Sequence, residues 1–190
     1  MEVNVEESNG RIGVLTAEPL ERGFGLTLGN AIRRILLSSL QGAAITSVKI
    51  KGVVHEFSTI PGVKEDLTDI LLNLKSVAVK VHSQGLKKMY LKSSGSGELR
   101  AGNFETDSET EIMNPDQIIM TLDSNADVEI EANVETGKGY VSAEVADDEN
   151  KVIGEIKLDA MFSPVVKASY KVENSRVGQV TDFDKLIFEV

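Results

Sequence analysis

The sequence contains no cysteine, which excludes disulfides, thiolate metal sites and cysteine nucleophiles together. This absence suits a reducing compartment, and we expect a cytoplasmic protein. No apolar run approaches the ~18 residues that a membrane helix requires. The acidic start, MEVNVEESNGR, also lacks the apolar region of a secretory signal. The sequence therefore predicts a protein with no membrane segment and no secretory signal.

Basic residues are scarce as well. The chain has 20 Lys and Arg against 30 Asp and Glu, which gives a formal net charge of -10. A protein that holds nucleic acid by neutralising phosphates needs the opposite balance, so we expect no direct DNA or RNA binding over most of the surface. With 41% hydrophobic residues among 190, the chain can still bury a sizeable core, as one domain or as two small ones.

Residue patterns typical of catalysis are also missing. The two histidines, His55 and His82, are far apart in the sequence, and each lies on a strand-like pattern without metal-ligand spacing. The acidic stretches 105–111 and 147–150 lack the spacing of a calcium loop, and we interpret them as solvated turns. No Gly-x-Ser-x-Gly motif occurs. The sequence therefore predicts no catalytic residue, no metal and no cofactor.

Three glycines, Gly23, Gly25 and Gly29, precede an apolar helical pattern and loosely resemble a dinucleotide-binding motif. The third glycine comes one residue too late, and Asn30 follows it where a phosphate-binding loop would have lysine. We favour the interpretation that the glycines allow a tight turn and close backbone packing. A nucleotide-binding enzyme is one alternative, and an unrelated acidic binding module with a β-rich ligand domain is another.

Turn residues and hydrophobic periodicity predict the order of elements along the chain. The first expected elements are a hairpin closed by Asn9 and Gly10 and a helix over about 27–40, capped by Thr27 and stopped at Gly42. A strand over 44–57 and a helix over about 64–74 follow. The rest of the chain is expected to form short strands over 77–158, with loops at 93–99 and 147–151, and then two strands around a turn at Asn174 and Ser175.

The first predicted helix carries apolar residues on more than one side. At about 100° per residue, one stripe groups Leu28, Ala31, Ile32, Ile35, Leu36 and Ser39. The opposite half holds Asn30, Arg33, Arg34 and Leu37. A single surface leucine is ordinary, yet Leu37 beside two arginines also forms the mixed patch that anchors protein interfaces. The stripe is wide enough to serve both a core and a second copy of the chain.

Two long segments, EPLERGFGLTLGNAIRRILLSSL (18–40) and GAAITSVKIKGVVHEFSTIPGVKEDLTDILLNLK (42–75), resemble the N-terminal domain of the alpha subunit of bacterial-type DNA-directed RNA polymerase. Shorter matches follow in the family's order: EIMNPDQ, GKGYVSA, FSPV and RVGQVTDFDKL. The resemblance therefore covers nearly the whole chain. Ser142 departs from the proline that the family usually has there, and Leu26 fills a variable position.

The resemblance implies an α+β fold in two parts. A discontinuous α/β dimerisation domain would comprise residues 1–41 plus 165–190, and an inserted mostly-β domain would comprise 42–164. In the family the dimerisation domain continues past DKLIFEV into a further helix and then a separate DNA-binding domain, and this sequence has neither. The implied function is a non-catalytic assembly scaffold of DNA-directed RNA polymerase, a nucleotidyltransferase whose catalytic magnesium lies in the large subunits.

The resemblance also implies the partners and the residues that contact them. The partners are a second copy of the chain and the beta and beta-prime subunits that carry out transcription. Dimer-interface positions are matched by Phe24, Leu28, Ile32 and Ile35. Beta-contacting positions are matched by Arg34 and Leu37, and positions associated with beta-prime by Lys75 and Arg176.

Overall fold

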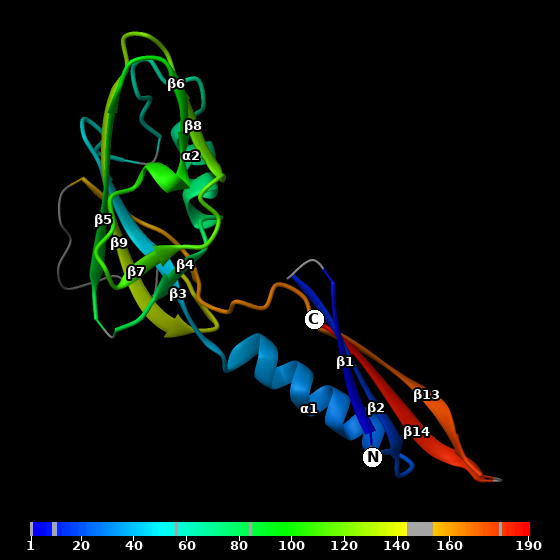
Figure 1. Cartoon of the computed structure of the whole chain (residues 1–190). Helices are drawn as coiled ribbons and strands as arrows, with labels where there is room; N and C mark the ends of the chain where they lie inside the picture. The colour runs from blue at the N-terminus through cyan, green and yellow to red at the C-terminus, as the bar shows by residue number, and fades with distance from the viewer. Residues whose placement is uncertain (1, 9–10, 56, 84, 144–153, 179) are drawn as a thin grey trace. The chain divides into compact units, whose positions relative to one another are not determined.

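The computed structural model describes residues 2–8, 11–55, 57–83, 85–143, 154–178 and 180–190, and the chain divides into two compact units (Figure 1). Unit 1 is Met1–Leu40 with Ser163–Val190, and unit 2 is Gln41–Phe162. Over the described residues the protein is mostly β with two α-helices. The dimerisation role of 1–41 plus 165–190 stays a prediction, and so does the expected domain boundary.

Unit 1 holds an antiparallel sheet in the order β1-β2-β14-β13. Its strands are β1 (Glu2–Ser8), β2 (Ile12–Leu20), β13 (Ser169–Val177) and β14 (Val180–Glu189). The predicted N-terminal hairpin is confirmed, because β1 pairs with β2 along its whole length, while the predicted closing pair, Asn9 and Gly10, lies outside the described residues. The turn predicted at Asn174 and Ser175 is wrong: both residues pair with β14 inside β13, and the chain reverses beyond them at Gly178, whose φ of 63° suits glycine.

The helix α1 (Phe24–Ser38) begins three residues before the predicted start and ends before Gly42. Thr27 does not cap it, since its hydroxyl donates to the Gly23 carbonyl at 3.1 Å. The free N–H groups at the start of the helix are bound instead by Asp184 on β14, whose Oδ2 accepts from Gly23 N at 2.8 Å and from Gly25 N at 3.1 Å. A carboxylate distant in sequence thus replaces a local cap.

The contact between α1 and its sheet runs along a row of glycines. The buried residues of α1 are Gly25 and Gly29, and the helix packs on β13 and β14. A methyl group on Gly29 would lie 2.5 Å from the Tyr170 ring, and one on Gly25 would lie 2.8 Å from Val172 Cγ1. These approaches are too close for any side chain, which confirms the interpretation that the glycines serve close packing.

Unit 2 is built on a six-stranded sheet over the described residues, in the order β5-β9-β3-β4-β7 with β11 also paired to β3. Its strands are β3 (Gln41–Ile50), β4 (Val79–Val81), β5 (Lys87–Ser94), β7 (Thr110–Ile112), β9 (Asp127–Lys138) and β11 (Glu155–Lys157). Two small pairs flank it, β6 (Gly97–Arg100) with β8 (Ile118–Leu122) and β10 (Tyr140–Val141) with β12 (Ala160–Met161). A short 3-10 helix spans Ala101–Asn103.

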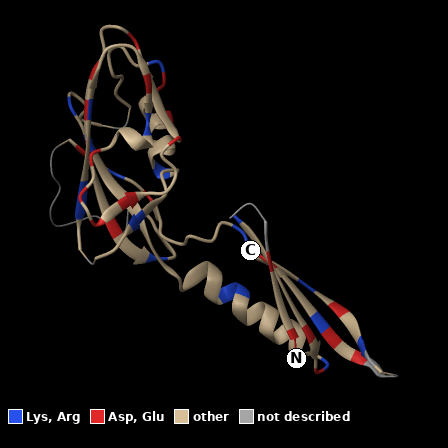
Figure 2. Ribbon diagram, viewed as in Figure 1, with Lys and Arg blue, Asp and Glu red and all other residues tan. Residues whose placement is uncertain are grey.

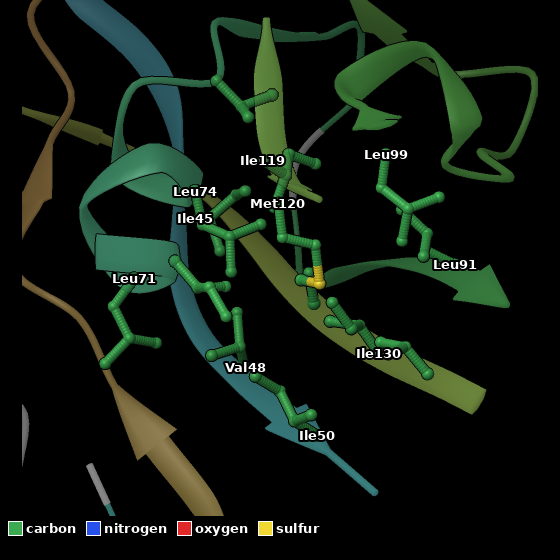
Figure 3. Packing of buried hydrophobic residues seen from close by; sticks show 14 of the residues in the cluster. Ile45, Val48, Ile50, Leu71, Leu74, Leu91, Leu99, Ile119, Met120 and Ile130 are labelled. Carbon is green, nitrogen blue, oxygen red and sulfur yellow. The ribbon is translucent and has the colours of Figure 1, made fainter. Parts of the chain in front are cut away.

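The second helix, α2 (Leu67–Lys75), closes the core of unit 2. Its apolar positions Leu67, Ile70, Leu71 and Leu74 are all buried, as their helical spacing predicts. Figure 3 shows Leu71 and Leu74 beside residues of β3 and β8, including Val48 and Met120. The helix starts later than the predicted residue 64 because Asp66 has an extended backbone, with ψ at 153°.

The other face of this sheet carries paired charges. Lys51 lies 3.4 Å from Glu129, and Lys88 forms an ion pair with Glu131. Figure 2 shows basic and acidic residues interspersed over unit 2. Exposed pairs of this kind contribute little stability, so the apolar side holds the unit together.

Three other predictions concern the loops of unit 2. Both histidines lie outside strands, because β3 ends at Ile50 and β4 ends at Val81, so the strand prediction for His55 and His82 is wrong. The loop predicted at 93–99 shortens to the two residues between β5 and β6. The loop predicted at 147–151 lies outside the described residues.

Replacing Gly29 with alanine tests the glycine contact. Alanine favours a helix over glycine by about 1 kcal/mol, but here the added methyl must displace the Tyr170 ring. We therefore expect Gly29→Ala to lower the free energy of opening of α1 by about 1 to 3 kcal/mol, measured by hydrogen exchange of the helix amides. The exposed neighbour is the control: Asn30→Ala should be neutral or slightly stabilising. A stabilising Gly29→Ala would contradict the packing.

Candidate protein-interaction surfaces

The helix α1 leaves large apolar side chains uncovered in unit 1. Phe24 is 52% exposed, Leu28 37% and Ile35 55%, and helical spacing places the three on one side of the helix. We call Phe24, Leu28 and Ile35 the α1 stripe. Ile32, predicted with them, is half-buried. The expected stripe is therefore split, because the glycine row makes the closest contact with the sheet and the larger side chains remain outside it.

The two adjacent arginines of α1 have different environments. Arg33 Nε donates to the Ala168 carbonyl at 3.0 Å and so joins the helix to the start of β13. Arg34 is exposed, and within the part of the chain that the structure describes its guanidinium forms no ion pair. Leu37 is half-buried. The sequence placed both arginines in one patch, whereas the structure leaves Arg34 as the one available for a partner.

Lys75 closes the C-terminal end of α2 and is already paired. Its Nζ donates to Asp159 Oδ2 at 3.0 Å, and the two side chains are 31% and 35% exposed. The same carboxylate accepts from the Ala143 N–H at 3.0 Å. Sequence reasoning missed Asp159, because a single carboxylate 84 positions from its partner gives no local signal.

Arg176 lies near the far end of β13, in unit 1, whereas Lys75 lies in unit 2. The Arg176 side chain is exposed, and its Nε donates to the Gly178 carbonyl at 2.6 Å. The remaining guanidinium donors of Arg176 can still bind a partner, because one hydrogen bond uses only one of five N–H groups.

Unit 2 also has a groove of about 430 Å³ beside the middle of β3. Three polar side chains on its wall bind one another: Asn133 Nδ2 lies 2.9 Å from Ser47 Oγ and 2.9 Å from Glu155 Oε1, and Ser47 donates to Glu155. The Ser47 hydroxyl, the Asn133 amide and the Glu155 carboxylate thus form one hydrogen-bonded group. Among the residues that the structure describes, no group of three metal-ligating side chains occurs.

Hydrogen bonds define the electrostatics of the Lys75 site. The N–H of Ala143, the Lys75 ammonium and the Tyr140 hydroxyl all lower the pKa of Asp159 from its ordinary value of 3.8, and desolvation opposes them only in part. The charged form is favoured in the folded state. The stabilisation is therefore complete above pH 3.8 and is lost as the pH falls through the lower pKa of the folded protein.

Removing the lysine should shift this titration. In Lys75→Met the pKa of Asp159 should rise toward its ordinary value, since one of the groups that lower it is gone. Carbon NMR of the carboxyl groups measures the change. Asp107 is the internal control, because Thr110 and Lys87 lower its pKa and Lys75 takes no part. An unchanged Asp159 in the variant would show that the pair is not formed in solution.

The described helices of this protein include none that is long and apolar enough to cross a membrane. Three features of the two units are exposed or partly exposed: the α1 stripe and Arg34 in unit 1, and the Lys75 side chain, paired with Asp159, in unit 2. These features make the two surfaces candidates for protein interaction.

A family model described as the RNA polymerase Rpb3/RpoA insert domain matches residues 48–163, more than half of the chain. The chain belongs to this family. It therefore carries a domain of the alpha/Rpb3 type of RNA polymerase subunit, and the resemblance seen in the sequence is confirmed at that level. The match falls almost wholly in unit 2.

Proposed function

We propose that the chain is a non-catalytic assembly scaffold that dimerises through α1 and binds the beta and beta-prime subunits of DNA-directed RNA polymerase. The observation that carries the proposal is the exposed α1 stripe on a helix whose inner side is held by glycines. Membership of the polymerase family supports the class of complex.

The α1 stripe suits a second copy of the chain for an energetic reason. Fully burying one large apolar side chain stabilises by about 1.5 to 3 kcal/mol, and a two-fold axis makes every contact occur twice. The helix is anchored by Asp184 and by the glycine row, so it presents the stripe in a fixed orientation. A preformed surface loses less conformational entropy on association than a mobile one.

The remaining site residues are assigned to the large subunits. Arg34 and Leu37 lie on a different side of α1 from the stripe, so a beta subunit can bind there without displacing the second copy. Lys75 and Arg176 are proposed for beta-prime. Arginine beside a leucine offers both a multidentate donor and apolar area, which is a frequent combination at binding hot spots.

The structure gives a physical argument against the nucleotide-binding alternative. A phosphate at the start of α1 would need the N–H groups of Gly23 and Gly25. Both already donate to the Asp184 carboxylate. An incoming phosphate would lose these donors and meet a negative charge at the same place.

The dimer prediction is tested by placing a charge in the α1 stripe. Ile35→Asp should shift the chain toward monomer, because an unpaired carboxylate cannot be buried in an apolar contact. Sedimentation over a dilution series measures the dissociation. Asn30→Asp, an exposed position on the same helix, is the matched control and should leave the equilibrium unchanged. A stable Ile35→Asp dimer would contradict the interface.

The two arginines provide a paired test of beta binding. Arg34→Ala and Leu37→Ala should each weaken binding of beta by ~2 kcal/mol with little change in melting temperature. Arg33→Ala should do the reverse, lowering stability by about 1 kcal/mol because it loses the hydrogen bond to Ala168. Titration calorimetry and thermal melting separate the effects. Equal losses of beta binding in Arg33→Ala and Arg34→Ala would refute the assignment.

A further inference from the structure

A small exposed apolar surface lies on the ribbon formed by β10 and β12. Tyr140 and Met161 are direct partners across this ribbon and are 59% and 61% exposed. Their neighbours Val141 and Ala160 point the other way and line the groove of unit 2. The ribbon thus has one side that faces the groove, where Ala160 is buried and Val141 is 37% exposed, and a more open side that carries the tyrosine and the methionine.

The Lys75 ion pair lies on that open side. Exposure alternates from Leu158 to Phe162, which places Asp159 on the same side as Met161. Asp159 binds Lys75 at the end of α2 and the N–H of Ala143 just after β10. One carboxylate therefore joins the helix to both strands of the ribbon.

We propose that Tyr140 and Met161 are the residues that contact the large polymerase subunit at this site, and that Lys75 acts through Asp159 as a positioning residue. The inference rests on the proposed function, since it names the contact surface for the partner assigned to Lys75. It reverses the expected roles, because the Lys75 ammonium is paired with Asp159, whereas the Tyr140 ring and the Met161 side chain are exposed.

The composition of the surface defines the partner segment. The cores of protein interfaces are rich in tyrosine and methionine and poor in lysine and aspartate. The charges of Lys75 and Asp159 balance each other, so the site favours no net charge on the partner. Leu72, one turn before Lys75 on the same side of α2, adds a third apolar side chain at 55% exposure. The segment that fits is apolar and uncharged, and it packs on the exposed Tyr140 ring and the Met161 side chain.

Stepwise reconstitution tests the contact residues. The 190-residue chain is mixed with purified beta subunit, and purified beta-prime subunit is then added and its affinity measured. Tyr140→Ser and Met161→Ser should each weaken beta-prime binding roughly ten-fold while beta binding and the melting temperature stay unchanged. Tyr90→Ser, an exposed tyrosine on β5, is the matched control and should bind like the wild type. Tyr140→Phe keeps the ring, loses only the hydroxyl that bonds Asp159, and should retain most of the affinity.

A double-mutant comparison tests the positioning role. Lys75→Met and Asp159→Asn should both weaken beta-prime binding, and the double variant should be no worse than Asp159→Asn alone, because Lys75 acts only through that carboxylate. If Lys75 touches the partner directly, Lys75→Met weakens binding while Asp159→Asn does not, and the inference is overturned.

The outcomes separate the inference from the proposed function. Wild-type binding of beta-prime with no effect of Tyr140→Ser or Met161→Ser overturns the inference and leaves the scaffold function standing. Failure of the wild-type chain to recruit beta-prime after beta overturns the proposed function itself.

Discussion

The close approach of α1 to β13 and β14 is the contact on which the surfaces of unit 1 depend. Glycine at two positions one turn apart lets the helix backbone rest directly on Tyr170 and Val172. The helix therefore needs few large side chains for its contact with the sheet. Phe24, Leu28 and Ile35 are left exposed as a consequence, and the proposed association surface follows from the way the helix is packed.

Single carboxylates perform the same structural task in both units. Asp184 accepts two backbone N–H groups at the start of α1, and Asp159 accepts one backbone N–H and the Lys75 ammonium at the end of α2. Each acidic side chain is distant in sequence from the helix it secures. A carboxylate that accepts several donors orients its element more strictly than apolar packing does, because hydrogen bonds are directional.

Side chains of the same chemical type can therefore have opposite roles, one bonded within its own unit and the other exposed. Arg33 and Arg34 are adjacent and chemically identical, yet one binds the Ala168 carbonyl and the other stays exposed. Lys75 belongs with the first kind, since its charge is balanced within unit 2. The exposed tyrosine and methionine of the ribbon belong with the second, and the proposed partner contacts follow from this division.

Local patterns in the sequence determined the elements whose neighbours are near in the chain: the β1–β2 hairpin, the buried positions of α2 and the role of the α1 glycines. The polymerase family was also identifiable, because long ordered matches need no three-dimensional information. Tertiary structure alone decided the cap of α1, the extension of β13 through Asn174 and Ser175, and the partner of Lys75. Each of these depends on a strand or carboxylate far along the chain, and such pairings leave no periodic signal among neighbouring residues.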